Sequence, residues 1–374
     1  MASWRWLLVL WQLSWFQMGD SGFTSFKTSN QPGWKQVTVP ADGIYIVSVS
    51  AYPCYHCGSN LYASLTIKSR YGFGTIFNVD GYFIVSHTEV AMALRRNNLL
   101  TLSVRGSMQG PSSLSIAYVS GLDGSYTTVF TTSSSAVPHF NKELLDTSWR
   151  LLRGNQGTSF SVPTSGMYWV TAKVVPLYLT TSLSVTNEQG TFTSHLFTVT
   201  SQEKLSVSCS GAFRLRAGSV VKAKNLHSSA ISRDAVLSFV YLKGNRRPHT
   251  GSAEHIAFTG ILGSVQRRRY NQIITFPSHL TNYGYLYGRN GQVTIRTSGS
   301  YMICLRADPR KDVSIILDLV VNGNVKWSSS SEDGVSSGQT IPLVLKSGDT
   351  LKVVTHATGV LEADSLFSIA FLNN

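Results

Sequence analysis

One strand-entry motif occurs three times in this sequence, and the repetition constrains the fold more than any other feature. It reads VPADGIYIV at Val39–Val47, VPTSGMYWV at Val162–Val170 and IRTSGSYMI at Ile295–Ile303. In each copy a β-branched residue precedes a short polar turn, and a glycine two residues before a tyrosine begins an alternating apolar run. This pattern predicts a turn that enters a β-strand, three times along one chain.

The glycines of the motif are predicted at positions that need either a positive φ or a close approach of another group. Each tyrosine shares a strand face with the residue two further along. We therefore interpret six residues of the motif as structural, namely Gly43, Tyr45, Gly166, Tyr168, Gly299 and Tyr301.

Two further landmarks follow each copy at near-constant spacing. The first is a turn, LRRNNLLTL at 94–102, LRAGSVVKA at 215–223 and LKSGDTLKV at 345–353, which lies 52, 50 and 47 residues after the tyrosine. The second is a strand, LSIAYV at 114–119, LSFVYL at 237–242 and LFSIAF at 366–371, which lies 17, 19 and 18 residues after the turn. The recurrence of three landmarks in one order predicts a tandem triplicate of domain-sized repeats.

These landmarks divide the chain into predicted regions. We expect repeat one at 23–119, repeat two at 120–243, a linker at 244–254 and repeat three at 255–374, because the Gly, Pro and charged residues of KGNRRPHTGSAE show no periodicity. Residues 1–22 carry Arg5 before the apolar run from Trp6 to Trp11, which is too short to span a bilayer and predicts a secretory signal peptide. The alternative is that these residues form the opening strand of repeat one.

The composition is that of a folded, β-rich protein with a dispersed positive charge. Hydrophobic residues make up 43% and charged residues 14%, and the formal net charge is +13. Repeats one, two and three, with the linker counted in the third, carry +4, +5 and +4. Such a field favours acidic partners, such as anionic glycans, acidic membrane surfaces, nucleic acid or acidic proteins. The alternative is that the charge serves only to keep the protein soluble. We expect no specific nucleic-acid partner.

Short alternating runs separated by turns predict an all-β sandwich or jelly roll, because no stretch has sustained helical periodicity. Between two such runs, Asn322-Gly323 predicts a type I′ hairpin turn.

The repeats resemble the globular head of complement component one, subcomponent q, and its tumour necrosis factor-like relatives. The similar residues are Ala257-Phe258, the Pro-x-x-Gly-x-Tyr starts at 40–45 and 163–168, the Leu-x-x-Gly-Asp-x-Leu turn at 345–351 and the final strand SLFSIAFL at 365–372. The sequence departs from this pattern at Asn97-Asn98, at Gly218-Ser219 and at Arg296, and no collagen-like tract precedes the repeats.

The resemblance implies three tandem antiparallel jelly-roll domains of the kind that trimerise around a threefold axis. With three heads on one chain, we expect an intramolecular pseudo-trimer, because fusion raises the effective concentration of each head for the others. The alternative is a string of separate heads that recruit other chains.

The four cysteines are too few for a disulfide scaffold. Cys54 and Cys57 are open to three interpretations, a redox pair, half of a zinc site, or a loop disulfide or two free thiols, of which the last is favoured. Cys209 and Cys304 lie in apolar strand contexts and are predicted to be small core residues.

No motif predicts catalysis, a metal site or a cofactor. Gly19-Asp-Ser-Gly22 matches the surroundings of a serine nucleophile, but no domain precedes it to supply the histidine and aspartate. The candidate ligand-binding residues are the basic runs Arg267-Arg268-Arg269 and Arg95-Arg96, because guanidinium groups suit sulfate, phosphate and carboxylate. The alternate positions 283, 285 and 287 are all tyrosines, so Tyr283, Tyr285 and Tyr287 share one face of the predicted strand. They form either a platform for carbohydrate or, as we expect, a strip that faces a neighbouring head.

The sequence therefore predicts a secreted, non-enzymatic recognition protein whose heads bind anionic or glycan surfaces. The alternatives are a tumour necrosis factor-like ligand for a protein receptor and a structural matrix protein.

Overall fold

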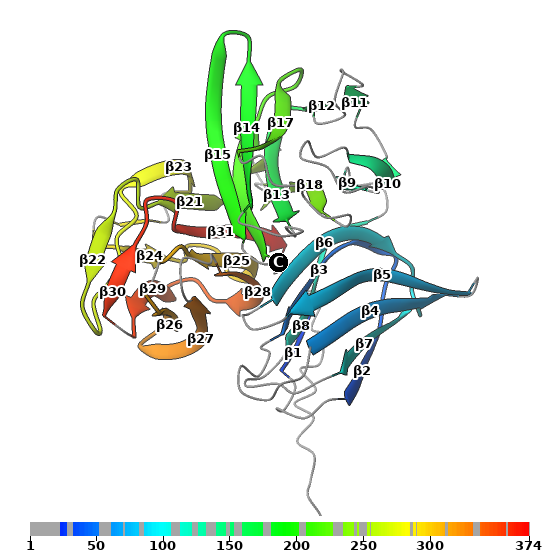
Figure 1. Ribbon diagram of the computed structural model, residues 1–374, viewed down its shortest axis with the longest axis horizontal. Helices are drawn as coiled ribbons and strands as arrows, with labels where there is room; N and C mark the ends of the chain where they lie inside the picture. Colours follow the sequence, from blue (N-terminus) through cyan, green and yellow to red (C-terminus); the bar gives the residue numbers. More distant parts are fainter. Residues whose placement is uncertain are drawn as a thin grey trace, which may run out of the picture.

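The structure is a computed structural model of the whole chain. It describes residues 23–27, 33–51, 61–69, 72–81, 86–105, 113–121, 126–131, 140–146, 150–152, 159–174, 181–201, 207–226, 235–242, 245–246, 253–254, 256–284, 287–288, 290–310, 313–331, 337–356 and 358–373. Every regular element among these residues is a β-strand, and the strands form three sandwiches around a common centre (Figure 1). The all-β prediction is confirmed.

The first sandwich contains two four-stranded sheets. Their strands are β1 (Phe23–Lys27), β2 (Gly33–Thr38), β3 (Gly43–Ala51), β4 (Leu61–Ser69), β5 (Gly72–Gly81), β6 (Ser86–Leu94), β7 (Leu99–Arg105) and β8 (Ser113–Ser120). One sheet has the order β1-β8-β3-β6 and the other the order β2-β7-β4-β5.

The second sandwich repeats these orders with one more strand at the edge of each sheet. Its strands are β9 (Tyr126–Thr131), β10 (Phe140–Asp146), β11 (Arg150–Leu152), β12 (Ser159–Ser161), β13 (Gly166–Val174), β14 (Thr181–Gln189), β15 (Phe192–Ser201), β16 (Val207–Leu215), β17 (Val220–Asn225) and β18 (Val236–Leu242). The orders are β10-β9-β18-β13-β16 and β11-β12-β17-β14-β15.

The third sandwich has the same plan, with β23-β21-β31-β25-β28 in one sheet, β24-β29-β26-β27 in the other and a separate β22-β30 pair. Its strands are β21 (Ala257–Ile261), β22 (Gln266–Arg268), β23 (Ser278–Tyr283), β24 (Gln292–Thr294), β25 (Gly299–Ala307), β26 (Ile315–Val321), β27 (Asn324–Ser331), β28 (Ser337–Leu345), β29 (Thr350–Thr355), β30 (Gly359–Leu361) and β31 (Leu366–Asn373). Before it, β19 (Asn245–Arg246) and β20 (Ala253–Glu254) pair within the predicted linker.

In all three sandwiches the strand after the motif pairs antiparallel with the last strand of its repeat and with an edge strand. Strands that are neighbours in a sheet are therefore distant in sequence, as in a jelly roll. The jelly-roll fold class is confirmed, whereas the limits of the domains stay a prediction.

The repeated tyrosine holds the turn that precedes its strand. The hydroxyls of Tyr45, Tyr168 and Tyr301 donate to carbonyl oxygens four residues earlier, those of Ala41, Thr164 and Thr297, at 2.8, 2.6 and 2.7 Å. Each ring also meets an aromatic ring of the last strand edge-on, at centroid distances of 5.4, 5.3 and 5.3 Å for Tyr118, Tyr241 and Phe371. Phe371 is thus the counterpart of Tyr118, so the third copy of the last strand aligns one residue later than the sequence comparison placed it.

Close approach explains two of the three motif glycines. A Cβ added at Gly43 would lie 2.3 Å from Cε2 of Tyr118, and one at Gly166 would lie 2.3 Å from Cε2 of Tyr241. The glycines therefore leave room for the aromatic rings of the last strand. Gly299 instead has a φ of 153°.

The strand-entry motif and the later turn are joined by backbone hydrogen bonds in every sandwich. In the first, Val39 N donates to Asn98 O and Asn97 N donates to Val39 O, both at 2.8 Å. Val162 makes the equivalent pair with Ser219 and Gly218, and Ile295 makes it with Asp349 and Gly348. The two sequence landmarks therefore build one structural unit, which explains their fixed spacing.

The three sandwiches close a ring through their edge strands β6, β16 and β28. Strand β6 contacts β9, β13 and β18 of the second sandwich, β16 contacts β21, β23, β25 and β31 of the third, and β28 contacts β1, β3 and β8 of the first. The edge strands also contact one another. Each sandwich thus presents its edge to the next, and the arrangement closes after three, as a heterologous interface does in a trimer. The expected pseudo-trimer is confirmed.

Side chains of the next sandwich satisfy the free backbone groups of these edges. The Thr128 hydroxyl donates to Ala91 O at 2.7 Å, and the Thr259 hydroxyl donates to Ala212 O at 2.8 Å. Ala212 N in turn donates to Ser368 Oγ at 3.0 Å. At the equivalent position of β28 lies Pro342, which has no N–H. Each edge strand is therefore protected from pairing with other chains.

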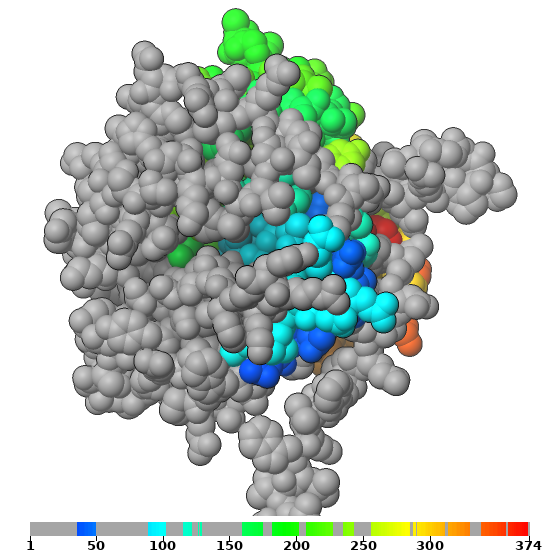
Figure 2. Space-filling view, turned by 90° about the vertical axis from the view of Figure 1, so that its right-hand side faces the viewer, coloured from blue at the N-terminus to red at the C-terminus, as the bar shows by residue number. Residues whose placement is uncertain are grey.

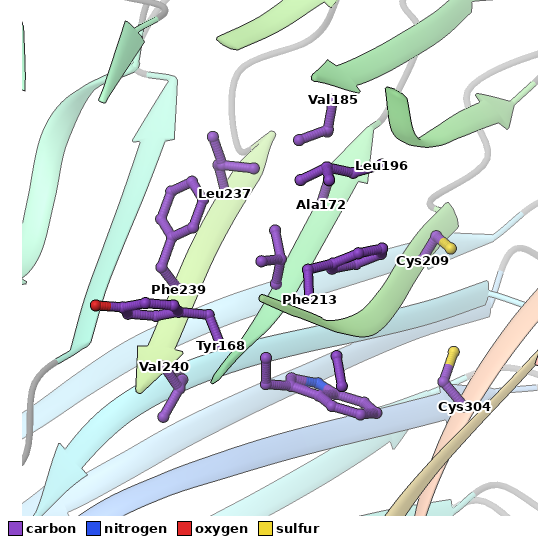
Figure 3. Packing of buried hydrophobic residues seen from close by; sticks show 14 of the residues in the cluster. Tyr168, Ala172, Val185, Leu196, Cys209, Phe213, Leu237, Phe239, Val240 and Cys304 are labelled. Carbon is purple, nitrogen blue, oxygen red and sulfur yellow. The ribbon is translucent and has the colours of Figure 1, made fainter. Parts of the chain in front are cut away.

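The buried core follows the same assembly. One hydrophobic cluster takes residues from all three sandwiches, including Ile46, Trp169 and Met302 at equivalent positions of β3, β13 and β25. Figure 3 shows part of this cluster, mostly residues of the second sandwich. A second cluster fills the interior of the third sandwich and includes Phe258, Phe276 and Phe367.

Candidate functional site

The predicted run Arg267–Arg269 lies at the end of β22, which pairs with β30. The alternation of a strand separates the three arginines, because Arg267 and Arg269 are exposed whereas Arg268 is only 9% exposed. Two guanidinium groups therefore face solvent from one short element, and the third is anchored beneath them.

Neighbouring residues extend this surface. Arg310 is exposed, and its N donates to Val360 O at 3.0 Å, while Val360 is the strand partner of Arg267. Next along the chain from Arg269, the ring of Tyr270, 62% exposed, lies 5.2 Å from the ring of His356. We define the basic face as Arg267, Arg269, Tyr270, Arg310 and His356.

One acidic group bounds the basic face. Asp318 Oδ2 lies 3.1 Å from Nδ1 of His356, and its other oxygen accepts a hydrogen bond from Ser328 at 2.7 Å. Because Asp318 is only 5% exposed, its charge is turned toward the protein. The outward groups of the face are thus cationic or aromatic, a combination that suits acidic ligands with planar or sugar-like parts.

Arg268 has a different role from its neighbours. Burial lowers the pKa of its guanidinium, while nearby Tyr287 acts in the opposite direction. Nε of Arg268 has no hydrogen-bond partner among the described residues. We interpret Arg268 as the anchor of β22, with no direct part in ligand contact.

The second predicted run, Arg95-Arg96, lies in the exposed turn between β6 and β7. There Arg95 N donates to Asn98 Oδ1 at 2.8 Å, and Arg96 N donates to Asp42 Oδ1 at 2.6 Å. The two predicted basic runs therefore lie on different sandwiches and do not form one site. Described surface of the first sandwich, blue and cyan, is visible in Figure 2.

The tyrosines of the third sandwich do not form one strip. The ring of Tyr283 faces the second sandwich, where Arg214 Nη1 donates to its hydroxyl at 2.6 Å and the guanidinium lies 5.3 Å from the ring centroid. Tyr287 points inward and stacks on Phe258 at 4.3 Å. The subunit-facing prediction holds for Tyr283 and is wrong for Tyr287, and the side chain of Tyr285 lies outside the described residues.

A buried carboxylate between the first and second sandwiches was not predicted. Oε1 of Glu89, on β6, accepts hydrogen bonds from Trp169 Nε1 at 2.7 Å, Thr171 Oγ1 at 2.5 Å and Ser210 Oγ at 2.8 Å. Glu89 is fully buried. It thus specifies the contact of β6 with the second sandwich. The feature of the sequence that could have revealed this contact is Glu89 itself. It is a single acidic residue, two positions before Ala91, on the face of β6 that carries small apolar side chains.

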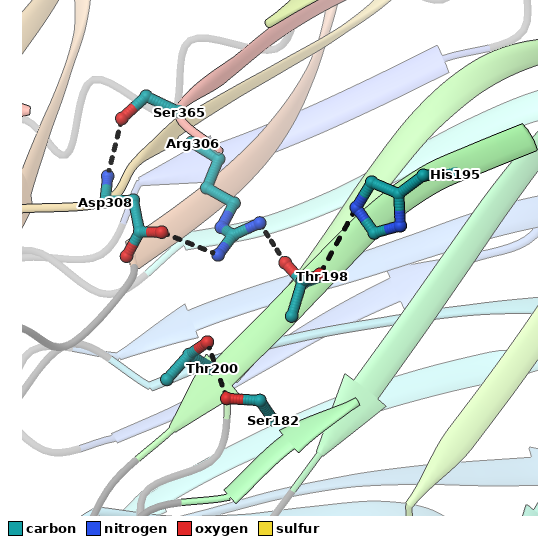
Figure 4. A network of polar contacts seen from close by, with 7 residues as sticks. All are labelled: Ser182, His195, Thr198, Thr200, Arg306, Asp308 and Ser365. Atoms are coloured by element: carbon teal, nitrogen blue, oxygen red, sulfur yellow. Dashed lines mark hydrogen bonds and ion pairs between the residues drawn. The ribbon is translucent and has the colours of Figure 1, made fainter. Parts of the chain in front are cut away.

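A buried arginine, which was not predicted either, joins the second and third sandwiches (Figure 4). Arg306, on β25 and fully buried, donates from Nη1 to Thr198 O on β15 and lies 3.3 Å from Asp308. Asp308 N is held by Ser365 Oγ at 3.0 Å. The guanidinium therefore crosses from one sandwich into the edge of another.

Other predicted features have no described chemistry. Cys54 and Cys57 lie outside the described residues, so their interpretations stay open. Within the described ranges, no group of three or more His, Cys, Asp or Glu side chains is placed to hold a metal ion. The described part of the chain also contains no helix long and apolar enough to cross a membrane.

Comparisons with known proteins found similarity among solved structures alone. No protein-family model and no curated protein matches the chain. Among solved structures the chain is similar to murine APRIL at pH 5.0, with 21% identity over 32% of this chain and 100% of that one and a TM-score of 0.27. It is also similar to Eiger TNF from S. frugiperda, with 16% identity over 34% of this chain and 98% of that one and a TM-score of 0.27.

Proposed function

We propose that this chain is an extracellular, non-enzymatic binding protein that recognises an acidic ligand, such as a sulfated or carboxylated glycan, through its basic face. The observation that carries the proposal is the outward presentation of Arg267 and Arg269 from β22, beside Arg310 and the exposed ring of Tyr270. Guanidinium groups bind sulfate and carboxylate bidentately, and an aromatic ring gives a sugar an apolar surface.

The ring of sandwiches supports this assignment. The edge strands and the inward faces are already used by contacts within the chain. Ligand contact is thus left to the outer surface, where the net charge of +13 favours acidic partners. Secretion belongs to the proposal and rests on the predicted signal peptide at 1–22.

Binding to an immobilised sulfated glycan, measured at low and at physiological salt, tests the proposal. We expect Arg267→Glu/Arg269→Glu to weaken binding at least about tenfold, and we expect binding by the unaltered chain to fall as salt rises. The control is Lys326→Glu, which reverses a charge at an exposed position of β27 and leaves the basic face unchanged.

Equal binding by the double variant and the unaltered chain would contradict the assignment of the basic face. Binding to neither the sulfated glycan nor an acidic protein at low salt would instead favour the receptor-ligand alternative, in which tumour necrosis factor-like heads engage a protein receptor.

A further inference from the structure

Cys209 and Cys304 come from different sandwiches and meet at the interface between them. Cys209 lies on β16 and Cys304 on β25, and each is 1% exposed. Their sulfur atoms point toward each other (Figure 3), and both side chains are free thiols. Both are buried core residues, as predicted, but the sequence did not predict that they face each other, because they are 95 positions apart.

Contacts on either side fix the relative position of the two strands. A Cβ added at Gly338 of β28 would lie 2.5 Å from the carbonyl oxygen of Ser208, so the third sandwich touches β16 just before Cys209. Just after it, Ala212 is held by Thr259 and Ser368. Because Ser368 is also the strand partner of Cys304, the same contacts position both cysteines.

Packing alone does not explain the choice of cysteine. Positions equivalent to Cys304 hold Ser48 in β3 and Thr171 in β13, and positions equivalent to Cys209 hold Thr88 in β6 and Gln339 in β28. The fold therefore accepts other small or polar side chains there, and sulfur occupies both positions only where the second sandwich meets the third.

We propose that Cys209 and Cys304 are a modification site, at which oxidation by a small peroxide forms a disulfide that locks the third sandwich to the second. Cys209 attacks one oxygen of hydrogen peroxide, the O–O bond breaks, and Cys209 becomes a sulfenic acid while hydroxide leaves. The sulfur of Cys304 then loses its proton and attacks the sulfur of Cys209. The oxygen bound to the Cys209 sulfur takes up a proton and leaves as water. Two thiols are oxidised and one peroxide is reduced to two waters.

The electrostatic surroundings give the two cysteines different roles. Although burial raises it, the pKa of the Cys209 thiol is lowered overall by the neighbouring Cys304 thiol and by the charge of Arg306. The neighbouring Cys209 thiol, together with burial, raises the pKa of Cys304 well above its usual range. We assign Cys209 as the nucleophile because the positive charge of Arg306 stabilises its thiolate, and Cys304 as the resolving thiol.

Peptide mass spectrometry after peroxide treatment tests the proposal in a full chain that carries Cys54→Ser and Cys57→Ser. We expect a non-reduced peptide that links residues 209 and 304, its loss on reduction, and an unfolding midpoint that rises by about 5 °C or more in the oxidised protein. With Cys304→Ser added, Cys209 should stop at a sulfenic acid that a dimedone-type probe captures.

Thiols that stay unlinked after peroxide treatment, or a linked peptide that forms without any change in the unfolding midpoint, would overturn the proposal. The first measurement needs no substitution at either interface cysteine, so it holds even if Cys304→Ser weakens the fold.

Discussion

At the residue scale, the turn after each edge strand shows how different side chains build one geometry. Asn97, Gly218 and Gly348 all adopt positive φ, at 67°, 77° and 94°. Asparagine tolerates this region better than other residues with a Cβ. The following residue completes the turn, because Asn98 and Asp349 accept hydrogen bonds from the N–H groups of Arg95 and Lys346 at 2.8 and 2.7 Å. The departure of the first repeat from Gly-Asp is therefore conservative.

Four buried phenols make the fold sensitive to alkali. Burial raises the pKa of Tyr45 and Tyr126 to about 12. It also raises the pKa of Tyr168 and Tyr301. Because the folded pKa values exceed the unfolded value of 10.0, the stability from these neutral phenols is complete below pH 10 and is lost as the pH rises toward 12 and beyond.

Denaturant unfolding monitored between pH 8 and 12 checks this prediction. The free energy of unfolding should fall above pH 10, and Tyr168→Phe should make that fall less steep. If the absorbance of all the phenols titrated with a single midpoint near pH 10 while the protein stayed folded, the buried, neutral state of these tyrosines would be disproved.

The sequence predicted the tyrosines and glycines as scaffold but could not supply their partners. Tyr118, Tyr241 and Phe371 lie about 70 residues along the chain, and only the antiparallel pairing of the last strand with the motif strand brings their rings to Gly43, Gly166 and Tyr301. The type I′ turn at Asn322-Gly323 was predictable because it is local, and both residues have positive φ, 50° and 81°.

At the element scale, each edge strand depends on side chains of the next sandwich. Thr259→Val should remove the hydroxyl that bonds both the N–H and the C=O of Ala212 and keep a similar volume. We expect the free energy of unfolding to fall by about 1–3 kcal/mol, because buried backbone groups lose a partner. Thr294→Val, at an exposed position of β24, is the matched control and should change stability by less than about 0.5 kcal/mol in urea unfolding.

An equal effect of Thr259→Val and Thr294→Val would mean that the Thr259 hydroxyl does not hold the edge of β16.

The sequence did not predict that Arg268 is buried while Arg267 and Arg269 are exposed. Alternation along a strand would separate them in this way, but three successive arginines carry no apolar pattern to fix the register. The register of β22, which decides the direction of each arginine, is therefore given only by the pairing of β22 with β30 in the structure.

At the scale of the whole molecule, Glu89 connects the first sandwich to the second. Glu89→Ala would leave the side chains of Trp169, Thr171 and Ser210 without this acceptor, so we expect a loss of at least about 3 kcal/mol of unfolding free energy. Glu188→Ala, which removes a half-exposed ion pair with Lys222, should cost less than about 1 kcal/mol. Comparable losses in chemical denaturation would argue against Glu89 as an interface determinant.

The triplicate predicted a closed ring, yet not the polar groups within it. Four polar or sulfur-containing residues lie among apolar residues of their strands, and each interacts with a strand of another sandwich. They are Glu89, Arg306, Cys209 and Cys304. Local patterns carry no information on such contacts. The candidate ligand-binding residues, by contrast, are visible in the sequence as dense basic runs, and only their division between two sandwiches required the structure.

Small-angle X-ray scattering, with sedimentation of the same sample, tests the ring of three sandwiches most directly. A single compact chain of 374 residues should have a radius of gyration of about 21 Å. We predict a value near this, at the mass of one chain and independent of protein concentration. A markedly larger radius at the mass of one chain, or an assembly of three chains with nine sandwiches, would contradict the closed ring.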